Sequence, residues 1–127
     1  MIQVNFLLVM IGGFFGAMSR FALGEWIHID NGFPLGTFII NLTGCFVLGW
    51  FLTYVNQKKK VRAEFALIFG TGFVGSFTTF STFSVETINL FQQGLVFWGL
   101  FYVLATTILG LLLTYLGHKL ALLKEIR

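Results

Sequence analysis

Residues 70–84 of the chain read GTGFVGSFTTFSTFS, and they lie in the middle of an apolar stretch that extends from about Ala63 to Phe91. Three glycines fall within the first six of these residues, and six hydroxyl side chains and three phenylalanines follow them. Glycine weakens a helix, and a helix of about 20 residues already crosses a membrane. The stretch is longer than that, so we predict a membrane-spanning helix that is broken near its middle.

The composition of the whole chain is that of a membrane protein. It has 127 residues, of which 57% are hydrophobic and 10% are charged, whereas an ordinary soluble domain is about 25% charged. Its length accommodates four membrane-spanning helices in a single domain, residues 1–127, and we place them at about 4–26, 35–55, 63–91 and 95–116. They leave no room for a soluble catalytic domain, so we expect no enzyme. The few charges are clustered outside the spans, and we expect no nucleic-acid partner.

Lysine and arginine are distributed unevenly around the predicted spans. Arg20 lies near the connections on one side, and seven others lie on the opposite side, namely Lys58, Lys59, Lys60, Arg62, Lys119, Lys124 and Arg127. The positive-inside rule then predicts that both termini face the cytoplasm. We expect a multi-pass protein of the plasma membrane, which in bacteria is the inner membrane.

The residues after the glycines combine aromatic rings with hydroxyls. Phe77, Phe80 and Phe83 recur every three residues along one side of a helix, and Ser81 and Ser84 form a neighbouring row. Hydroxyls donate hydrogen bonds, and ring edges carry the positive end of the aromatic quadrupole, so this wall suits a small anion. Freed backbone carbonyls suit a cation instead. The structural alternative is ring packing, with each hydroxyl bonded to the preceding helical turn.

Other polar side chains inside the spans also need partners. Arg20 is either an interfacial anchor or a cation that attracts anions to a vestibule, and Glu25 is one possible local partner for it. Asn41 either links two helices or donates to an ion path, and Thr114 can extend the hydroxyl row. Glu86 is the only acid well inside the apolar segments, and it lies far along the third one. A proton-coupled cation exporter of this size depends on a carboxylate in its first span, whereas the first span here carries Arg20 and no acid near its middle.

Three groups of residues, one in each of the first three predicted spans, together resemble the Fluc (CrcB-type) fluoride channel family. They are Gly12-Gly13 through Gly16-Ala17 with Arg20, then Gly36-Thr37 with Asn41, and then the run from Gly75 to Ser84. The resemblance covers essentially the whole chain in length and in number of spans. It implies a passive channel that lets fluoride leave the cytoplasm, built as an antiparallel, dual-topology homodimer with two pores at the subunit interface.

The resemblance also implies a role for particular residues. The pore would be lined by an aromatic pair, an amide and a hydroxyl track, which are Phe80 and Phe83, Asn41, and Ser81, Ser84 and Thr114. The backbone carbonyls of Gly75 and Thr78 would hold a structural sodium ion at the dimer interface. Arg20 corresponds to an arginine near the vestibule. The choice of fluoride over chloride rests on the resemblance alone, because pore width and dehydration are not legible in residue types.

The uneven charge leaves two assemblies open. A homodimer that inserts in both orientations should carry little lysine and arginine bias, whereas this chain carries a strong one. We expect the dual-topology homodimer, in contact with membrane lipid, and keep as the alternative a pair formed with an oppositely oriented homologue.

Two other functions remain as alternatives to the channel. One is a small multidrug or guanidinium-type cation exporter, and the other is a membrane scaffold that transports nothing.

Overall fold

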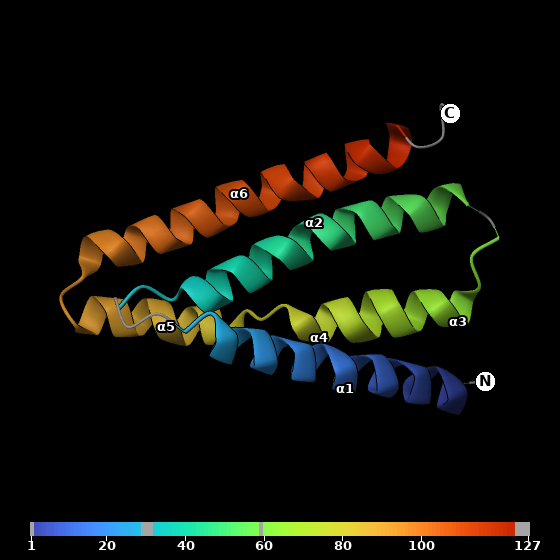
Figure 1. Ribbon diagram of the computed structural model, residues 1–127, viewed down its shortest axis with the longest axis horizontal. Coiled ribbons are helices and arrows are strands. Elements are labelled where there is room, and N and C mark those ends of the chain that lie inside the picture. The colour runs from blue at the N-terminus through green and yellow to red at the C-terminus, as the bar shows by residue number, and fades with distance from the viewer. Residues whose placement is uncertain (1, 29–31, 59, 124–127) are drawn as a thin grey trace.

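The computed structural model describes residues 2–28, 32–58 and 60–123. Its long helical segments lie side by side in one elongated bundle (Figure 1). They are α1 (Ile2–Trp26), α2 (Leu35–Gln57), a third span over Ala63–Gln92, and α6 (Val96–Leu123). Each of these four segments of the described chain is long and apolar enough to cross a membrane. The prediction of an all-helical chain with four such segments is confirmed, although α6 continues beyond its predicted end at about residue 116.

The third span consists of several consecutive elements. These are α3 (Ala63–Ala66), the π-helix η1 (Leu67–Val74), α4 (Gly75–Phe77) and α5 (Ser81–Gln92). The glycine-rich stretch itself stays helical, and the backbone becomes extended only at Thr78, with φ −76° and ψ 155°. Glycine is needed in η1 for another reason, because a Cβ on Gly72 would lie 2.7 Å from the carbonyl oxygen of Val9 and 2.9 Å from the Cα of Gly12. The glycines therefore allow α1 to approach closely.

A column of aromatic rings runs along the third span from α3 through η1 to α4. Phe65, Phe69, Phe73 and Phe77 follow one another at intervals of four residues, with centroids 5.5 to 6.0 Å apart and planes within 9° of parallel. Hydrogen bonds from residue i to i+5 widen the turn, which brings side chains four residues apart closer to alignment. Phe51 of α2 packs against this column, 4.7 Å from Phe69 between centroids. The column thus joins α2 to the third span.

Helix pairs are held together by small residues. Gly12 and Gly16 of α1 are buried, and a Cβ on either would overlap the carbonyl oxygen of Ile68 or Phe73 in η1. In the same way, a Cβ on Gly49 of α2 would overlap the carbonyl oxygen of Thr114 in α6. Close backbone approach at small residues is the usual way in which membrane helices associate. The bundle therefore consists of two tight pairs, α1 with the third span and α2 with α6.

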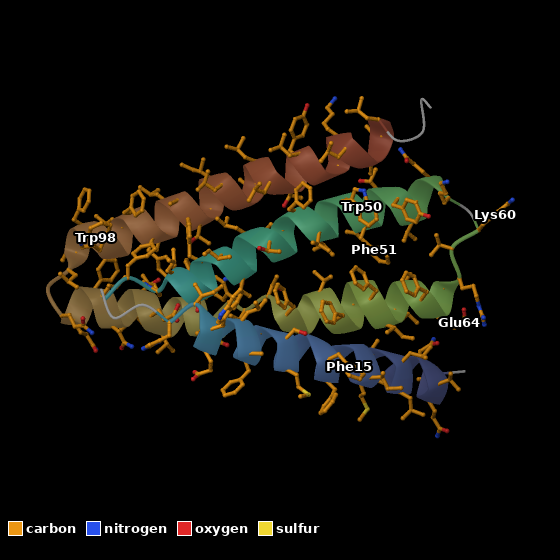
Figure 2. The ribbon with its side chains drawn as sticks, viewed as in Figure 1. Phe15, Trp50, Phe51, Lys60, Glu64 and Trp98 are labelled. Atoms are coloured by element: carbon orange, nitrogen blue, oxygen red, sulfur yellow. The ribbon has the colours of Figure 1, made fainter. Side chains whose placement is uncertain are left out.

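Large apolar side chains cover the outside of the bundle. Figure 2 shows them projecting outward along α1 and α6, where Phe15 and Trp98 are 57% and 46% exposed. The buried apolar core of the described chain is small by comparison and comprises Ile40, Phe51, Val74, Phe77, Leu90, Tyr102 and Ala121. Exposed apolar surface on this scale marks contact with a membrane or another protein. The outer faces are thus suited to lipid or to a second subunit.

Candidate functional site

The extended backbone after α4 is held by the side chain of Asn41. Its Nδ2 donates a hydrogen bond of 2.9 Å to the carbonyl oxygen of Thr79, and its Oδ1 accepts one of 2.8 Å from the N–H of Thr79. The two residues are only 9% and 8% exposed. Backbone groups that leave a helix inside a membrane must find partners in the protein. Asn41 provides both partners, and the second proton of its amide has no acceptor among the described residues.

Thr79 also starts the helix that follows. Its Oγ1 accepts a hydrogen bond of 3.2 Å from the N–H of Thr82, and it lies 3.2 Å from the hydroxyl of Thr82 and 3.3 Å from that of Ser81. Thr79 directly precedes Phe80, the N-cap residue of α5, and its hydroxyl satisfies an N–H in the first turn of that helix. The sequence-based prediction gave no role to Thr79, although a hydroxyl residue just before a predicted helix is a signal for such a bond.

A groove of about 330 Å³ lies beside this segment. Its lining comes from α2, the extended segment, α5 and α6, and comprises Asn41, Gly44, Cys45, Leu48, Thr78, Thr79, Phe80, Phe83, Thr106 and Thr107. The Phe80 side chain is 79% exposed, and its ring centroid is 5.8 Å from that of Phe83. The structure therefore brings together three of the predicted pore residues, Asn41, Phe80 and Phe83.

The predicted hydroxyl track is not part of that lining. Ser84 donates to the carbonyl oxygen of Phe80 at 2.9 Å, and Thr114 donates to that of Gly110 at 2.8 Å. Both hydroxyls are thus bonded to the preceding turn of their own helix. Ser81 is exposed, and its hydroxyl lies next to that of Thr79. These three side chains lie outside the groove in the single chain.

The carbonyl oxygens of Gly75 and Thr78 fit the chemistry of a small cation. In a continuous helix the N–H of Thr79 would donate to Gly75, but here it donates to Asn41. The N–H of Thr82, which would donate to Thr78, donates to the side chain of Thr79 instead. Within the described chain no backbone N–H bonds to either carbonyl. Unwound carbonyls of this kind are the usual ligands of sodium in membrane proteins.

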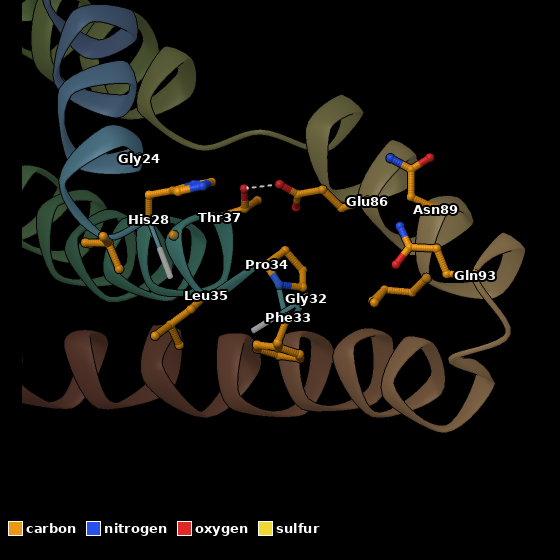
Figure 3. Close-up of a pocket in the computed structure, with 13 residues that line it drawn as sticks. Gly24, His28, Gly32, Phe33, Pro34, Leu35, Thr37, Glu86, Asn89 and Gln93 are labelled. Carbon is orange, nitrogen blue, oxygen red and sulfur yellow. Dashed lines mark hydrogen bonds between the residues drawn. The ribbon is translucent and has the colours of Figure 1, made fainter. Parts of the chain in front are cut away.

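A second polar cluster surrounds Glu86 of α5. The hydroxyls of Thr37 and Tyr102 donate to its two carboxylate oxygens at 2.8 Å each, and Tyr102 is fully buried. Figure 3 shows Thr37 and Glu86 facing each other in a pocket of about 510 Å³, whose lining also includes Asn89 and Gln93. This pocket was not predicted from the sequence, where Glu86 weighed only against an exporter. A lone acid in an apolar span requires hydrogen-bond donors nearby, so Glu86 itself predicted a polar cluster at this position.

Arg20 lies on α1, apart from both clusters. It is half-buried, and it forms no ion pair with Glu25 in the part of the chain that the structure describes. Residues five apart on a helix point to different sides, whereas those three or four apart are neighbours. The structure therefore does not join these two residues.

Comparison with known proteins gives consistent matches along the chain. The family model described as CrcB-like protein, Camphor Resistance (CrcB), matches residues 7–118. A protein of Oceanobacillus iheyensis named fluoride-specific ion channel FluC is 51% identical over 93% of this chain and 92% of its own. Proteins of Desulfitobacterium hafniense and Bacillus cereus, both named fluoride-specific ion channel FluC 1, are 47% and 45% identical. These matches cover 89% and 93% of this chain, and 97% and 88% of the relatives.

Proposed function

The chain belongs to the CrcB-like family, and from this premise we propose that it is a passive channel that conducts fluoride out of the cytoplasm. It is a multi-pass membrane protein, consistent with the bacterial inner membrane. The observation that carries the proposal is the groove beside the extended backbone at Thr78, where an amide and two aromatic rings meet. This surface offers hydrogen-bond donors and ring edges without a full positive charge.

Fluoride would exchange its hydration shell for several weak contacts along this surface. The free Nδ2 proton of Asn41 is a donor, and its orientation is fixed by the two bonds to Thr79. The edges of Phe80 and Phe83 carry partial positive charge and can face the ion. Conduction requires binding that is weak and repeated, so that the ion both enters and leaves. A series of neutral contacts meets this requirement better than one strong cation would.

The hydroxyls of Ser81, Ser84 and Thr114 would extend this series. Each hydroxyl has one proton, and those of Ser84 and Thr114 are given to carbonyl oxygens. When fluoride passes, the hydroxyl can rotate and exchange a carbonyl acceptor for the ion, at a small net change in hydrogen-bond energy. We further propose that Arg20 lines the entrance, where its charge would raise the local concentration of anions.

The groove of one chain is open, which supports a dimer. Phe80 is 79% exposed at a position that an antiparallel partner would cover, and two such grooves at one interface would form two pores. The carbonyls of Gly75 and Thr78 and those of the partner would hold a sodium ion, which would compensate the carbonyl dipoles. We propose a homodimer in dual topology, with an oppositely oriented homologue as the alternative partner.

Efflux from liposomes tests the function. Purified protein is reconstituted into vesicles loaded with potassium fluoride, valinomycin is added, and external fluoride is recorded with a selective electrode. Rapid release of fluoride, with negligible release of chloride from matched vesicles, is the expected result. Folded protein that releases no fluoride alone or with a co-expressed homologue would contradict the channel. Release that requires a proton gradient would favour the cation exporter, and full tolerance of polar substitutions in the groove would favour the scaffold.

Removal of sodium is expected to weaken the dimer. If the carbonyls of Gly75 and Thr78 bind sodium, replacing it with potassium at equal ionic strength should raise the dimer dissociation constant about tenfold, equivalent to ~1.4 kcal/mol. Single-molecule photobleaching at decreasing protein-to-lipid ratio measures that constant. Restoring sodium provides the control, because it should restore the dimer. A constant unchanged after long exchange would remove sodium from the interface.

A further inference from the structure

Most cationic side chains of the described chain gather at one end of the bundle. α2 and α6 run in the same direction and finish at this end, where α3 begins (Figure 1). We call the four cations here, Lys58, Lys60, Arg62 and Lys119, the basic collar. Figure 2 marks its position with the labels of Lys60 and Glu64. Glu64 is the acid that the structure describes at this end, and it lies 3.5 Å from Arg62. The three lysines of the collar therefore remain uncompensated within the described chain.

Two of these lysines extend over tyrosine rings of their own helices. The Nζ of Lys58 lies 5.7 Å from the ring centroid of Tyr54, and that of Lys119 lies 5.5 Å from the centroid of Tyr115. Tyr54 in turn stacks on Trp50, with planes 12° apart. Tyrosine and tryptophan concentrate at the headgroup level of a membrane, and lysine stems extend along apolar surface to place their charge at the interface.

A hydrogen bond between α2 and α6 fixes the relative depth of the two lysines. The Thr53 hydroxyl lies 2.8 Å from the Nδ1 of His118 and also 2.8 Å from the carbonyl oxygen of Gly49. Lys119 directly follows His118, whereas Lys58 comes five residues after Thr53. With the two helices parallel, Lys58 lies about 6 Å farther out along the axis. The headgroup layer is about 5 to 8 Å thick on each side, so these two cations span it.

We propose that the basic collar binds the phosphate groups of anionic phospholipids. The uncompensated charge, the aromatic support and the depth of the two lysines all suit a layer of lipid phosphates, and neutral lipids have no net charge to match. Each lysine near such a surface favours an anionic lipid by about five-fold. Binding at this surface is independent of whether the groove conducts fluoride, so the two proposals can fail separately.

One tryptophan allows lipid binding to be measured next to the collar. The chain has three tryptophans. Trp50 lies on α2 under the collar, whereas Trp98 lies at the opposite end (Figure 2). The variant W26F/W98F leaves Trp50 as the fluorescent reporter, in vesicles that contain a minority of brominated phosphatidylglycerol or brominated phosphatidylcholine. We expect phosphatidylglycerol to be preferred at Trp50 by about five-fold or more, and the preference to decrease as salt screens the charges.

Matched variants separate the collar from a general lipid effect. Adding K58Q and K119Q to the W26F/W98F variant should bring the ratio of phosphatidylglycerol to phosphatidylcholine binding at Trp50 close to one. Adding K58R and K119R instead should retain the preference for phosphatidylglycerol. Equal quenching of Trp50 by both lipids, or a preference that survives the glutamine substitutions, would overturn the proposal. So would loss of the preference when inorganic phosphate replaces chloride at equal ionic strength, because the collar would then be a site for the free ion.

A second measurement covers the case in which the tryptophan variants do not fold. The unsubstituted protein and its K58Q/K119Q variant are purified in parallel, and their bound phospholipids are extracted and quantified. The collar predicts a several-fold lower ratio of anionic to neutral lipid in the variant. An equal ratio would contradict it.

Discussion

Replacing Phe80 by isoleucine is expected to lower fluoride efflux by at least about tenfold, which corresponds to ~1.4 kcal/mol at the transition state for conduction. Isoleucine fills similar space but has no quadrupole, so the partial positive charge of the ring edge is lost. The side chain is 79% exposed in the single chain, and its replacement should not unfold the bundle. Efflux and dimer content are measured on the same preparation, so that a lost pore is distinguished from a lost protein.

Phe97→Ile is the matched control. Phe97 is 73% exposed on α6 and is not among the residues that line the groove. The same chemical change there should leave efflux within about twofold of the unsubstituted protein. If Phe80→Ile conducts normally with the dimer intact, Phe80 is not in the pore and the proposed ion path is wrong.

Replacing Asn41 by alanine should be the most damaging change in the groove. It leaves both the N–H and the carbonyl of Thr79 without partners, and each unpaired buried group costs about 1–3 kcal/mol. Because Thr79 also accepts a hydrogen bond from the first turn of α5, we expect the extended segment to rearrange and efflux to fall by more than about tenfold. Circular dichroism during heating in detergent measures the loss of stability, and the liposome assay measures the loss of conduction.

Two other asparagine substitutions make the interpretation specific. Asn41→Asp keeps the shape and the acceptor for the N–H of Thr79 but loses the donor to its carbonyl, so intermediate stability and strongly reduced efflux are expected. Asn56→Ala, at an exposed position near the end of α2, should change neither quantity. Normal stability and efflux in Asn41→Ala would show that the Asn41–Thr79 pair does not organise the site.

Hydropathy was sufficient to predict the spans, because each is a long apolar run whose backbone bonds are satisfied locally. The position of the extended residues was harder to predict. Glycine suggested a break at 70–75, yet Gly70 and Gly72 are buried in η1. The departure from the helix occurs at Thr78, where Asn41, 38 residues before Thr79, replaces the helical partners. A pairing across that distance depends on how α2 packs, which no local pattern contains.

The polar residues could likewise be predicted only in part, because their positions are visible in the sequence and their distant partners are not. One groove is lined by three of the pore residues predicted from the sequence, Asn41, Phe80 and Phe83. Their role in conduction stays a prediction. Glu86 was recognised as unusual, but its partners Thr37 and Tyr102 come from other helices. The sequence indicates that an acid inside an apolar span needs donors, and it does not indicate which residues supply them.

The number of residues in the π-helix η1 determines the direction in which the later side chains of the third span point. Each residue of an α-helix turns the chain by about 100°, so a third span with one residue fewer between Leu67 and Val74 would rotate Thr79 away from Asn41 and Glu86 away from Tyr102. The packing against α1 fixes the length of this segment. The wider turns of η1 fit one more residue into that length than an α-helix would, and the parallel rings pack along these turns. Both the number and the types of residues between the start of α3 and the groove are therefore constrained. Insertions and deletions in this segment should be far rarer in natural sequences than substitutions.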